Sequence, residues 1–177
     1  VVYFTLDSVA PTADIVDVSP DPGTSGVSTI DIVFSEVVFG FELDDLALSR
    51  DGTSISLSGA TLDTTDDINW TLSGLTDTST IGNYTLTLDA AASGVTDGAG
   101  NALSADASDQ WTVQPEAPVM DTEPALTPGT TNTVSWAAVS GADAYYVQLD
   151  DDPAFGSPDD NSGWISCVTT ASRRSGD

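Results

Sequence analysis

The chain has 177 residues, of which 28 are acidic and three are arginine, with neither lysine nor histidine, so its formal net charge is −25. This charge excludes nucleic acid and anionic membranes as partners, because both need cationic contacts. The absence of histidine removes the commonest general base and zinc ligand, and the single cysteine, Cys167, rules out an intrachain disulfide.

No apolar run reaches the roughly 18 residues that a membrane-spanning helix needs, so no membrane insertion is predicted. Residues 1–6 lack the basic start and the long apolar stretch of a signal peptide and have the pattern of a strand. We therefore expect the sequence to be a piece of a longer polypeptide.

Short runs in which apolar and polar residues alternate recur along the chain. They lie at residues 30–34, 55–57, 68–72, 84–88 and 111–113. Clusters of proline, glycine, aspartate and asparagine separate them, and the one helix candidate is a turn at residues 42–46. Many short, half-buried strands without helical periodicity predict an all-β fold, an antiparallel β-sandwich.

An internal repeat predicts the domain boundaries. Residues 4–11 align without gaps with residues 111–118, and each copy runs from an aromatic-Thr-aliphatic strand into a linker that ends in Ala-Pro. We interpret residues 1–10 as the last strand of a preceding repeat, residues 11–114 as one complete domain and residues 115–177 as the next. Proline in these short linkers predicts a stiff joint, because its ring fixes φ.

The third segment is short for a sandwich. Residues 134–136 and 145–149 predict two strands, and residues 164–165 begin another. Residues 167–177 differ in composition, since they hold the sole cysteine and two of the three arginines. A truncated or frame-shifted end is the interpretation that fits this change.

Several of these stretches together resemble a known family. Residues 10–15, 19–22, 32–36, 84–88 and 97–103 are similar to the bacterial Ig-like repeats of large secreted and surface-layer proteins. Residues 130–166, through Trp136 and the run at 141–147, resemble a bacterial fibronectin type III domain that is incomplete here.

This resemblance implies a non-catalytic spacer or adhesion module of a large bacterial protein, located outside the cell or on its surface. Its expected partners are neighbouring domains of the same polypeptide and cell-surface polymers or other proteins. The alternative is an accessory region of a secreted multidomain hydrolase. We predict no enzyme activity in this chain, because no carboxylate pair has the pattern of a buried, raised-pKa acid facing a second carboxylate.

Calcium is the one cofactor that the sequence suggests. Asp97 and Asn101 lie four residues apart on a glycine-rich turn and could direct oxygens to one point. They would supply part of the six to eight oxygens that calcium takes. A turn shaped by hydrogen bonds is the other interpretation. Asp7, Asp14 and Asp17 surround the first linker, and Glu116, Asp121 and Glu123 the second, either as calcium ligands at a joint or as solvated linker residues.

The aromatic residues receive structural interpretations. Trp70, Trp111 and Trp136 lie within alternating patterns and are expected in the core, whereas Trp164 is expected at the surface. Tyr84 resembles the tyrosine that pins the strand corner of Ig-like folds. The remaining acidic clusters are interpreted as a solubilising surface.

Overall fold

The computed structural model describes residues 6–122, 131–149, 160–166 and 170–174. The chain divides into two compact units, Val1–Gln114 (unit 1) and Pro115–Asp177 (unit 2). Among the helices in these described ranges, none is long and apolar enough to cross a membrane.

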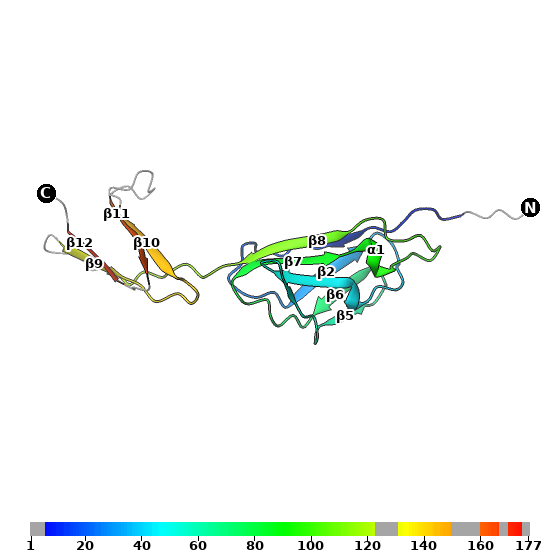
Figure 1. Ribbon diagram of the computed structural model, residues 1–177, viewed down its shortest axis with the longest axis horizontal. Helices are drawn as coiled ribbons and strands as arrows, with labels where there is room; N and C mark the ends of the chain where they lie inside the picture. The colour runs from blue at the N-terminus through cyan, green and yellow to red at the C-terminus, as the bar shows by residue number, and fades with distance from the viewer. Residues whose placement is uncertain (1–5, 123–130, 150–159, 167–169, 175–177) are drawn as a thin grey trace, which may run out of the picture. The chain divides into compact units, whose positions relative to one another are not determined.

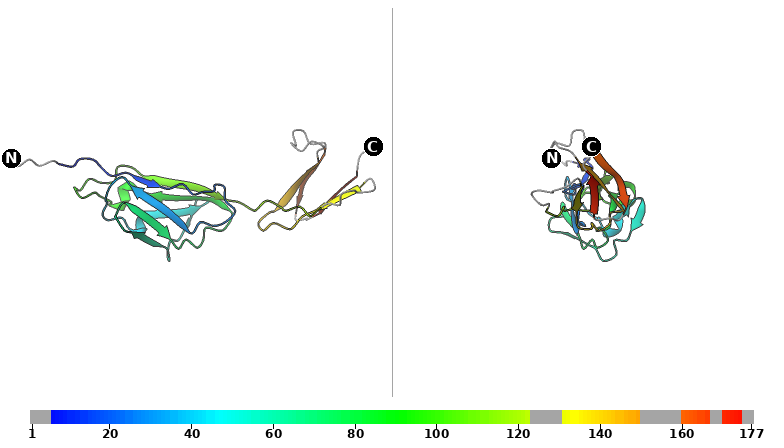
Figure 2. Two further views of the ribbon diagram at one scale, coloured as in Figure 1. Left: turned by 180° about the vertical axis from the view of Figure 1, so that it is seen from behind. Right: turned by 90° about the vertical axis from the view of Figure 1, so that its left-hand side faces the viewer.

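Unit 1 consists of two four-stranded antiparallel sheets that face one another (Figures 1 and 2). The first sheet has the order β1 (Ala13–Ile15), β2 (Thr29–Phe34), β6 (Asn69–Ser73) and β5 (Thr61–Thr64). The second has the order β4 (Thr53–Ile55), β3 (Leu46–Arg50), β7 (Gly82–Leu88) and β8 (Ala107–Val113). The predicted antiparallel sandwich is confirmed.

Only two short helical turns accompany the sheets: η1 (Leu43–Asp45) and α1 (Ala90–Ser93) are the helices of the described residues. The turn predicted at residues 42–46 corresponds to η1, where the Glu42 N–H donates to Asp45 Oδ2 (2.7 Å). Helix α1 was not predicted. The amides of its second and third residues, Ala91 and Ala92, donate to Asp89 Oδ1 (2.9 and 3.1 Å).

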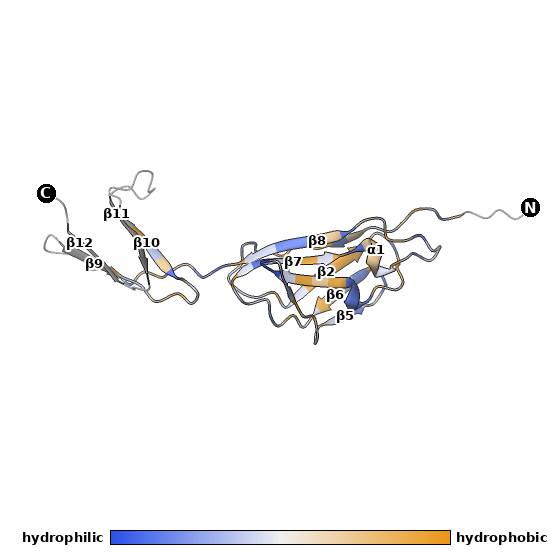
Figure 3. Cartoon of the chain, in the orientation of Figure 1, coloured by the Kyte–Doolittle hydropathy of each residue, from blue (hydrophilic) through white to orange (hydrophobic). Residues whose placement is uncertain are grey.

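Period-two alternation explains the core. In β7, Tyr84, Leu86 and Leu88 are fully buried, while Asn83, on the other face, is exposed. Figure 3 shows the same alternation as orange and pale stretches along the strands of unit 1. Burial of one face of each sheet against the other is what stabilises the sandwich, since no disulfide contributes.

Aromatic residues hold the interior. The Tyr84 and Trp111 rings stack at 5.3 Å with 7° between their planes. Phe41 contacts Phe34 and Trp70 edge to face. Trp111 is buried as predicted, and Trp70 packs half-buried against the core.

Tyr84 has the role that the resemblance implied. Its hydroxyl donates to the Thr80 carbonyl (2.6 Å) and also lies 3.3 Å from the Asp77 carbonyl. It therefore pins the loop before β7 to the sheet.

The first segment of unit 1 changes sheets. After pairing with β2 as β1, the chain crosses to the free edge of β8, where Gly23 and Val113 form a parallel bridge. Earlier, the Ser104 N–H donates to the Pro11 carbonyl (3.0 Å). Pro11 and Ser104 thus define one end of the sandwich, the N-proximal end, and Gly23 and Val113 define the opposite, C-proximal end.

Unit 2 has two antiparallel strand pairs in its described residues. In the first, β9 (Thr131–Ser135) pairs with β12 (Thr170–Arg174), and in the second, β10 (Ala144–Leu149) pairs with β11 (Asp160–Ser166). Trp136 is buried as predicted and meets Tyr145 edge to face at 5.3 Å. The side chain of Trp164 lies outside what the structure describes, and the likeness to fibronectin type III stays a prediction.

Candidate functional site

The turn from Asp97 to Asn101 is held by the Asp97 side chain. Asp97 is only 4% exposed. Its Oδ1 accepts hydrogen bonds from the amides of Ala99 (2.8 Å) and Asn101 (2.8 Å), and its Oδ2 accepts one from Asn101 Nδ2 (2.7 Å). Both carboxylate oxygens are therefore engaged by donors of the same turn.

Asn101 connects this turn to the segment before β1. Its Nδ2 donates to Asp97 Oδ2 and also lies within hydrogen-bonding distance of the backbone carbonyl oxygens of Asp7 (3.3 Å) and Val9 (3.2 Å). The pair predicted from sequence is thus brought together, with the Asn101 amide group acting as a donor.

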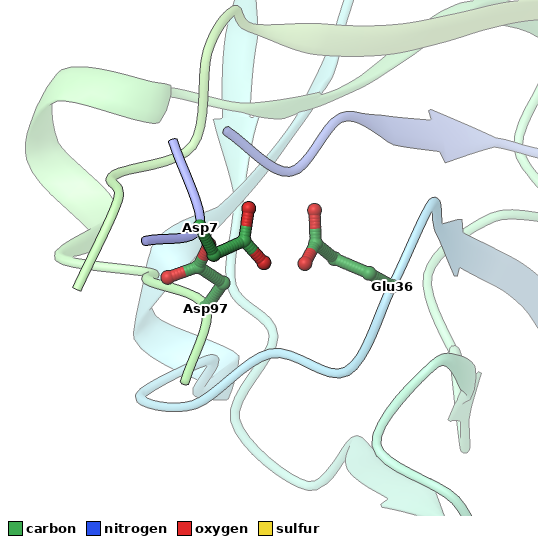
Figure 4. Close-up of side chains that lie close together, drawn as sticks. All are labelled: Asp7, Glu36 and Asp97. Atoms are coloured by element: carbon green, nitrogen blue, oxygen red, sulfur yellow. The ribbon is translucent and has the colours of Figure 1, made fainter. Parts of the chain in front are cut away.

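Three carboxylates from separate parts of the chain meet beside this turn. One oxygen each of Asp7, Glu36 and Asp97 lies within 4.8 Å of the other two. Figure 4 shows the Asp7 and Glu36 carboxylates pointing toward each other, with Asp97 next to Asp7. Asp7 precedes β1, Glu36 follows β2, and Asp97 lies between α1 and β8, so the group sits at the N-proximal end.

The environment shifts two of these groups in opposite directions. Burial raises the pKa of Glu36 above its usual value of 4.5, and the charges of Asp97 and Asp7 add to this. Hydrogen bonds, the one from the Asn101 side chain first, hold the pKa of Asp97 below its usual value of 3.8, although burial opposes them. The surroundings therefore favour the ionised form of Asp97 and disfavour that of Glu36.

The spacing of the oxygens fits a cation of calcium's size. Two ligands of one calcium ion at 2.3–2.6 Å can lie at most about 5 Å apart, and the three oxygens satisfy this limit. Calcium takes six to eight oxygens in all, so water or backbone carbonyls would have to supply at least three more.

The other predicted ligands lie elsewhere. Among the described residues, Asp14 and Asp17 do not join the group: Asp14 pairs with Val33 in the first sheet, and both are exposed. At the second linker, Glu116 and Asp121 are exposed, and the Asp121 carboxylate accepts a hydrogen bond from Ser135 Oγ. Glu123 lies outside the described residues.

Glu36 is the residue that sequence reasoning missed as a ligand. A signal for it exists, since antiparallel pairing of β1 with β2 puts the residues after β2 beside those before β1. Two hydrogen bonds with Thr12 fix this closeness: the Ser35 N–H donates to the Thr12 carbonyl (2.9 Å), and the Thr12 N–H donates to Ser35 Oγ (3.0 Å).

Hollows elsewhere in unit 1 do not involve this group. One of about 290 Å³ is lined by residues 16–20, 23 and 25–31, and one of about 430 Å³ by residues 43–44, 46–48 and 54–58. Neither includes Asp7, Glu36 or Asp97, so the carboxylates do not line these hollows.

Comparison with known proteins identifies a family for unit 1. No curated protein matches the chain. The sequence model of a family described as "Bacterial Ig-like domain" matches residues 7–114, which is more than half of the chain and includes both sheets of unit 1. With its facing antiparallel sheets and its Tyr84 corner, this chain belongs to the bacterial Ig-like domain family.

Proposed function

We propose that this chain is a structural spacer or adhesion module of a large bacterial protein that is secreted or held at the cell surface. Bacterial Ig-like domains are generally non-catalytic modules of larger proteins and are typically extracellular. For this chain we propose a spacer role and a location outside the cell or at its surface. Its partners would be the neighbouring domains of the same polypeptide and, for adhesion, surface polymers or other proteins.

One observation carries the spacer role: the chain enters and leaves unit 1 at opposite ends. Pro11 lies beside Ser104 at the N-proximal end, and β8 finishes beside Gly23 at the C-proximal end. In Figure 1 the segment before β1 and the end of β8 accordingly leave the sandwich on opposite sides. Modules of this form, joined in series, each add their own length to the chain.

The acidic surface supports the same role. Residues 1–114 contain eighteen aspartates and glutamates and one arginine, Arg50. Like charges on successive modules repel, which keeps a string of them from collapsing onto itself, and salt weakens this repulsion.

Two measurements test the proposal. Antiserum raised against the chain should label intact cells of the source bacterium or detect the protein in the culture medium. Small-angle scattering should give a maximum dimension that grows nearly in proportion when the chain is repeated in tandem. Labelling only after lysis, or a tandem no longer than one copy, would contradict it. A labelled band carrying glycoside- or peptide-hydrolysing activity would favour the accessory role in a secreted hydrolase.

Calcium-dependent stiffening of the joint is a second candidate function, favoured by the meeting of Asp7, Glu36 and Asp97 within 4.8 Å. Asp7 belongs to the segment leading into the sandwich, while Glu36 and Asp97 belong to its loops. An ion held by all three would relieve their mutual repulsion and tie the leading segment to the body of unit 1.

Thermal melts in calcium, in magnesium and in EDTA, at matched ionic strength, test this candidate. Calcium should raise the midpoint of unit 1 in the native chain and in Asp14→Asn, which removes one charge outside the group. Glu36→Gln should abolish the rise. Equal midpoints in calcium and in EDTA would contradict a calcium site. An equal rise with sodium would mean that charge screening alone stabilises the unit.

A further inference from the structure

The edge of β8 is bound to the first segment of unit 1 by a short parallel seam, which we define as residues 18–23 against residues 109–114. Two bonds are between backbones: the Gly23 N–H donates to the Thr112 carbonyl, and the Gln114 N–H donates to the Gly23 carbonyl (both 2.9 Å). Both lie at the C-proximal end.

Two carboxylates extend the seam where the backbones do not bond directly. The Val18 N–H donates to Asp109 Oδ2 (3.0 Å), and the Thr112 N–H donates to Asp21 Oδ1 (2.8 Å). Asp109 is buried on the inner side of β8 among apolar neighbours, at 7% exposure. The structure thus keeps a carboxylate at a core position, where it bonds the first segment.

The geometry decides how the seam responds to tension. Its two segments run in the same direction, from the N-proximal to the C-proximal end, but residues 18–23 connect to the incoming chain and residues 109–114 to the outgoing chain. Pulling the two ends of unit 1 apart therefore slides one segment past the other. The hydrogen bonds of the seam run between neighbouring strands and therefore lie across the direction of sliding. All of them carry the load at once, instead of breaking one after another.

The incoming chain has weaker attachments before the seam. It is held at the N-proximal end, where the Ser104 N–H donates to the Pro11 carbonyl (3.0 Å), and then by β1, which has three register pairs with β2. If β1 were pulled off, the chain would extend only to Val18, where the seam begins. The outgoing chain leaves β8, which β7 holds through seven register pairs.

We propose that this seam is the mechanical clamp of unit 1: under tension along the chain, its rupture is the step that allows the sandwich to unfold. The inference rests on the proposed spacer role only for the direction of natural load. An experiment that sets the pulling direction by its attachment points therefore tests the clamp separately from that role.

The test is single-molecule pulling of the full chain between its two termini. Unit 1 is recognised by the longer contour length that it releases. Asp21→Ala removes an exposed acceptor of the seam, and Gln114→Pro removes a donor at an exposed position whose preceding residue is already extended. Each variant should unfold about fivefold faster at a given force. The native state loses one hydrogen bond of about 1 kcal/mol that is already broken at the transition state, so the barrier to unfolding falls by that amount.

Thr64→Ala is the matched control. Thr64 Oγ1 accepts from the amides of Asp66 (3.3 Å) and Asp67 (2.9 Å) in the turn between β5 and β6, outside the load path. This variant should lose stability in urea but unfold under force within twofold of the native rate. Native rates in both seam variants, or equal acceleration in Thr64→Ala, would overturn the clamp. If hydrogen exchange shows that Gln114→Pro does not fold, the result for Asp21→Ala alone decides the test.

Discussion

At the C-proximal end of unit 1, Tyr84 lies flat against Trp111 and its hydroxyl bonds the Thr80 carbonyl, whereas at the N-proximal end the Asp97 carboxylate holds the turn to Asn101. The first anchor consists of two aromatic rings and a hydroxyl and contains no carboxylate. The second depends on one, and it sits beside Glu36, whose pKa is raised. The two ends should therefore respond differently to truncation, pH and ions, although they belong to one sandwich.

Truncating the aromatic anchor should have the largest effect. Trp111→Ala removes a side chain that is 2% exposed and should lower the free energy of unfolding by about 3–5 kcal/mol, at any pH between 5 and 8. Urea titration read by hydrogen exchange of peptides from β7 reports unit 1 alone. Gln110→Ala, the exposed neighbour on β8, should change little; a loss below about 1 kcal/mol in Trp111→Ala would mean that the stack is not an anchor.

Removing only the tyrosine hydroxyl should have a smaller effect. Tyr84→Phe keeps the stacked ring but leaves the Thr80 and Asp77 carbonyls without this part-buried donor, at a cost of about 1 kcal/mol. Thr87→Val is the control, because the Thr87 hydroxyl bonds the Ala47 carbonyl at an exposed position where water can replace it. If both variants lose equal stability in the same urea assay, the corner contributes nothing special.

The sequence predicts the C-proximal anchor better than the N-proximal group, for a physical reason. Alternation along residues 84–88 and 111–113 places Tyr84 and Trp111 on inner faces, because side chains of a strand alternate strictly. Asp97 and Asn101 are recognisable as one turn, because they are four residues apart. Glu36 joins them only through the pairing of β1 with β2, which local spacing does not reveal.

The missed strands follow the same logic. Strand β1 has three residues, and the edge strand β5 has only Leu62 as a large apolar residue, so neither gives a clear alternating signal. Strand β3 begins directly after η1, and its first residue was assigned to the predicted turn. The run predicted at 55–57 is only partly right, because β4 ends at Ile55.

A pair of substitutions at the N-proximal end should act in opposite directions. In EDTA at neutral pH, Asp97→Asn should destabilise unit 1, because it replaces an acceptor of three hydrogen bonds. Glu36→Gln should stabilise it, because it removes the charge that burial, Asp97 and Asp7 disfavour. Melting midpoints measure both, and two shifts of the same sign would contradict the comparison.

The pH dependence of this pair follows from the direction of each pKa shift. Asp97 has a lowered pKa when folded, so its contribution is present above the unfolded value near 3.8 and is lost as pH falls through the folded pKa. Glu36 has a raised pKa, so its charge destabilises most above that pKa, and the gain from Glu36→Gln should vanish below about 4.5. Midpoints that differ from the native chain equally at every pH would exclude ionisation as the cause.

The turn at Asp66 provides an internal control with the smallest expected effect. It repeats the hydrogen-bonding arrangement of Asp97, but no glutamate is among the groups that shift the pKa of Asp66. Asp66 accepts from the Ile68 amide (3.0 Å), the Asn69 amide (2.7 Å) and Asn69 Nδ2 (2.8 Å), and these bonds, the one from the Asn69 amide first, lower its pKa below 3.8. Carboxylate NMR titration should place both Asp66 and Asp97 below 3.8 and Glu36 above 4.5. Calcium should leave the Asp66 titration unchanged; if it shifted Asp66 as much as Glu36, the ion would be acting on the acidic surface generally rather than at the N-proximal group.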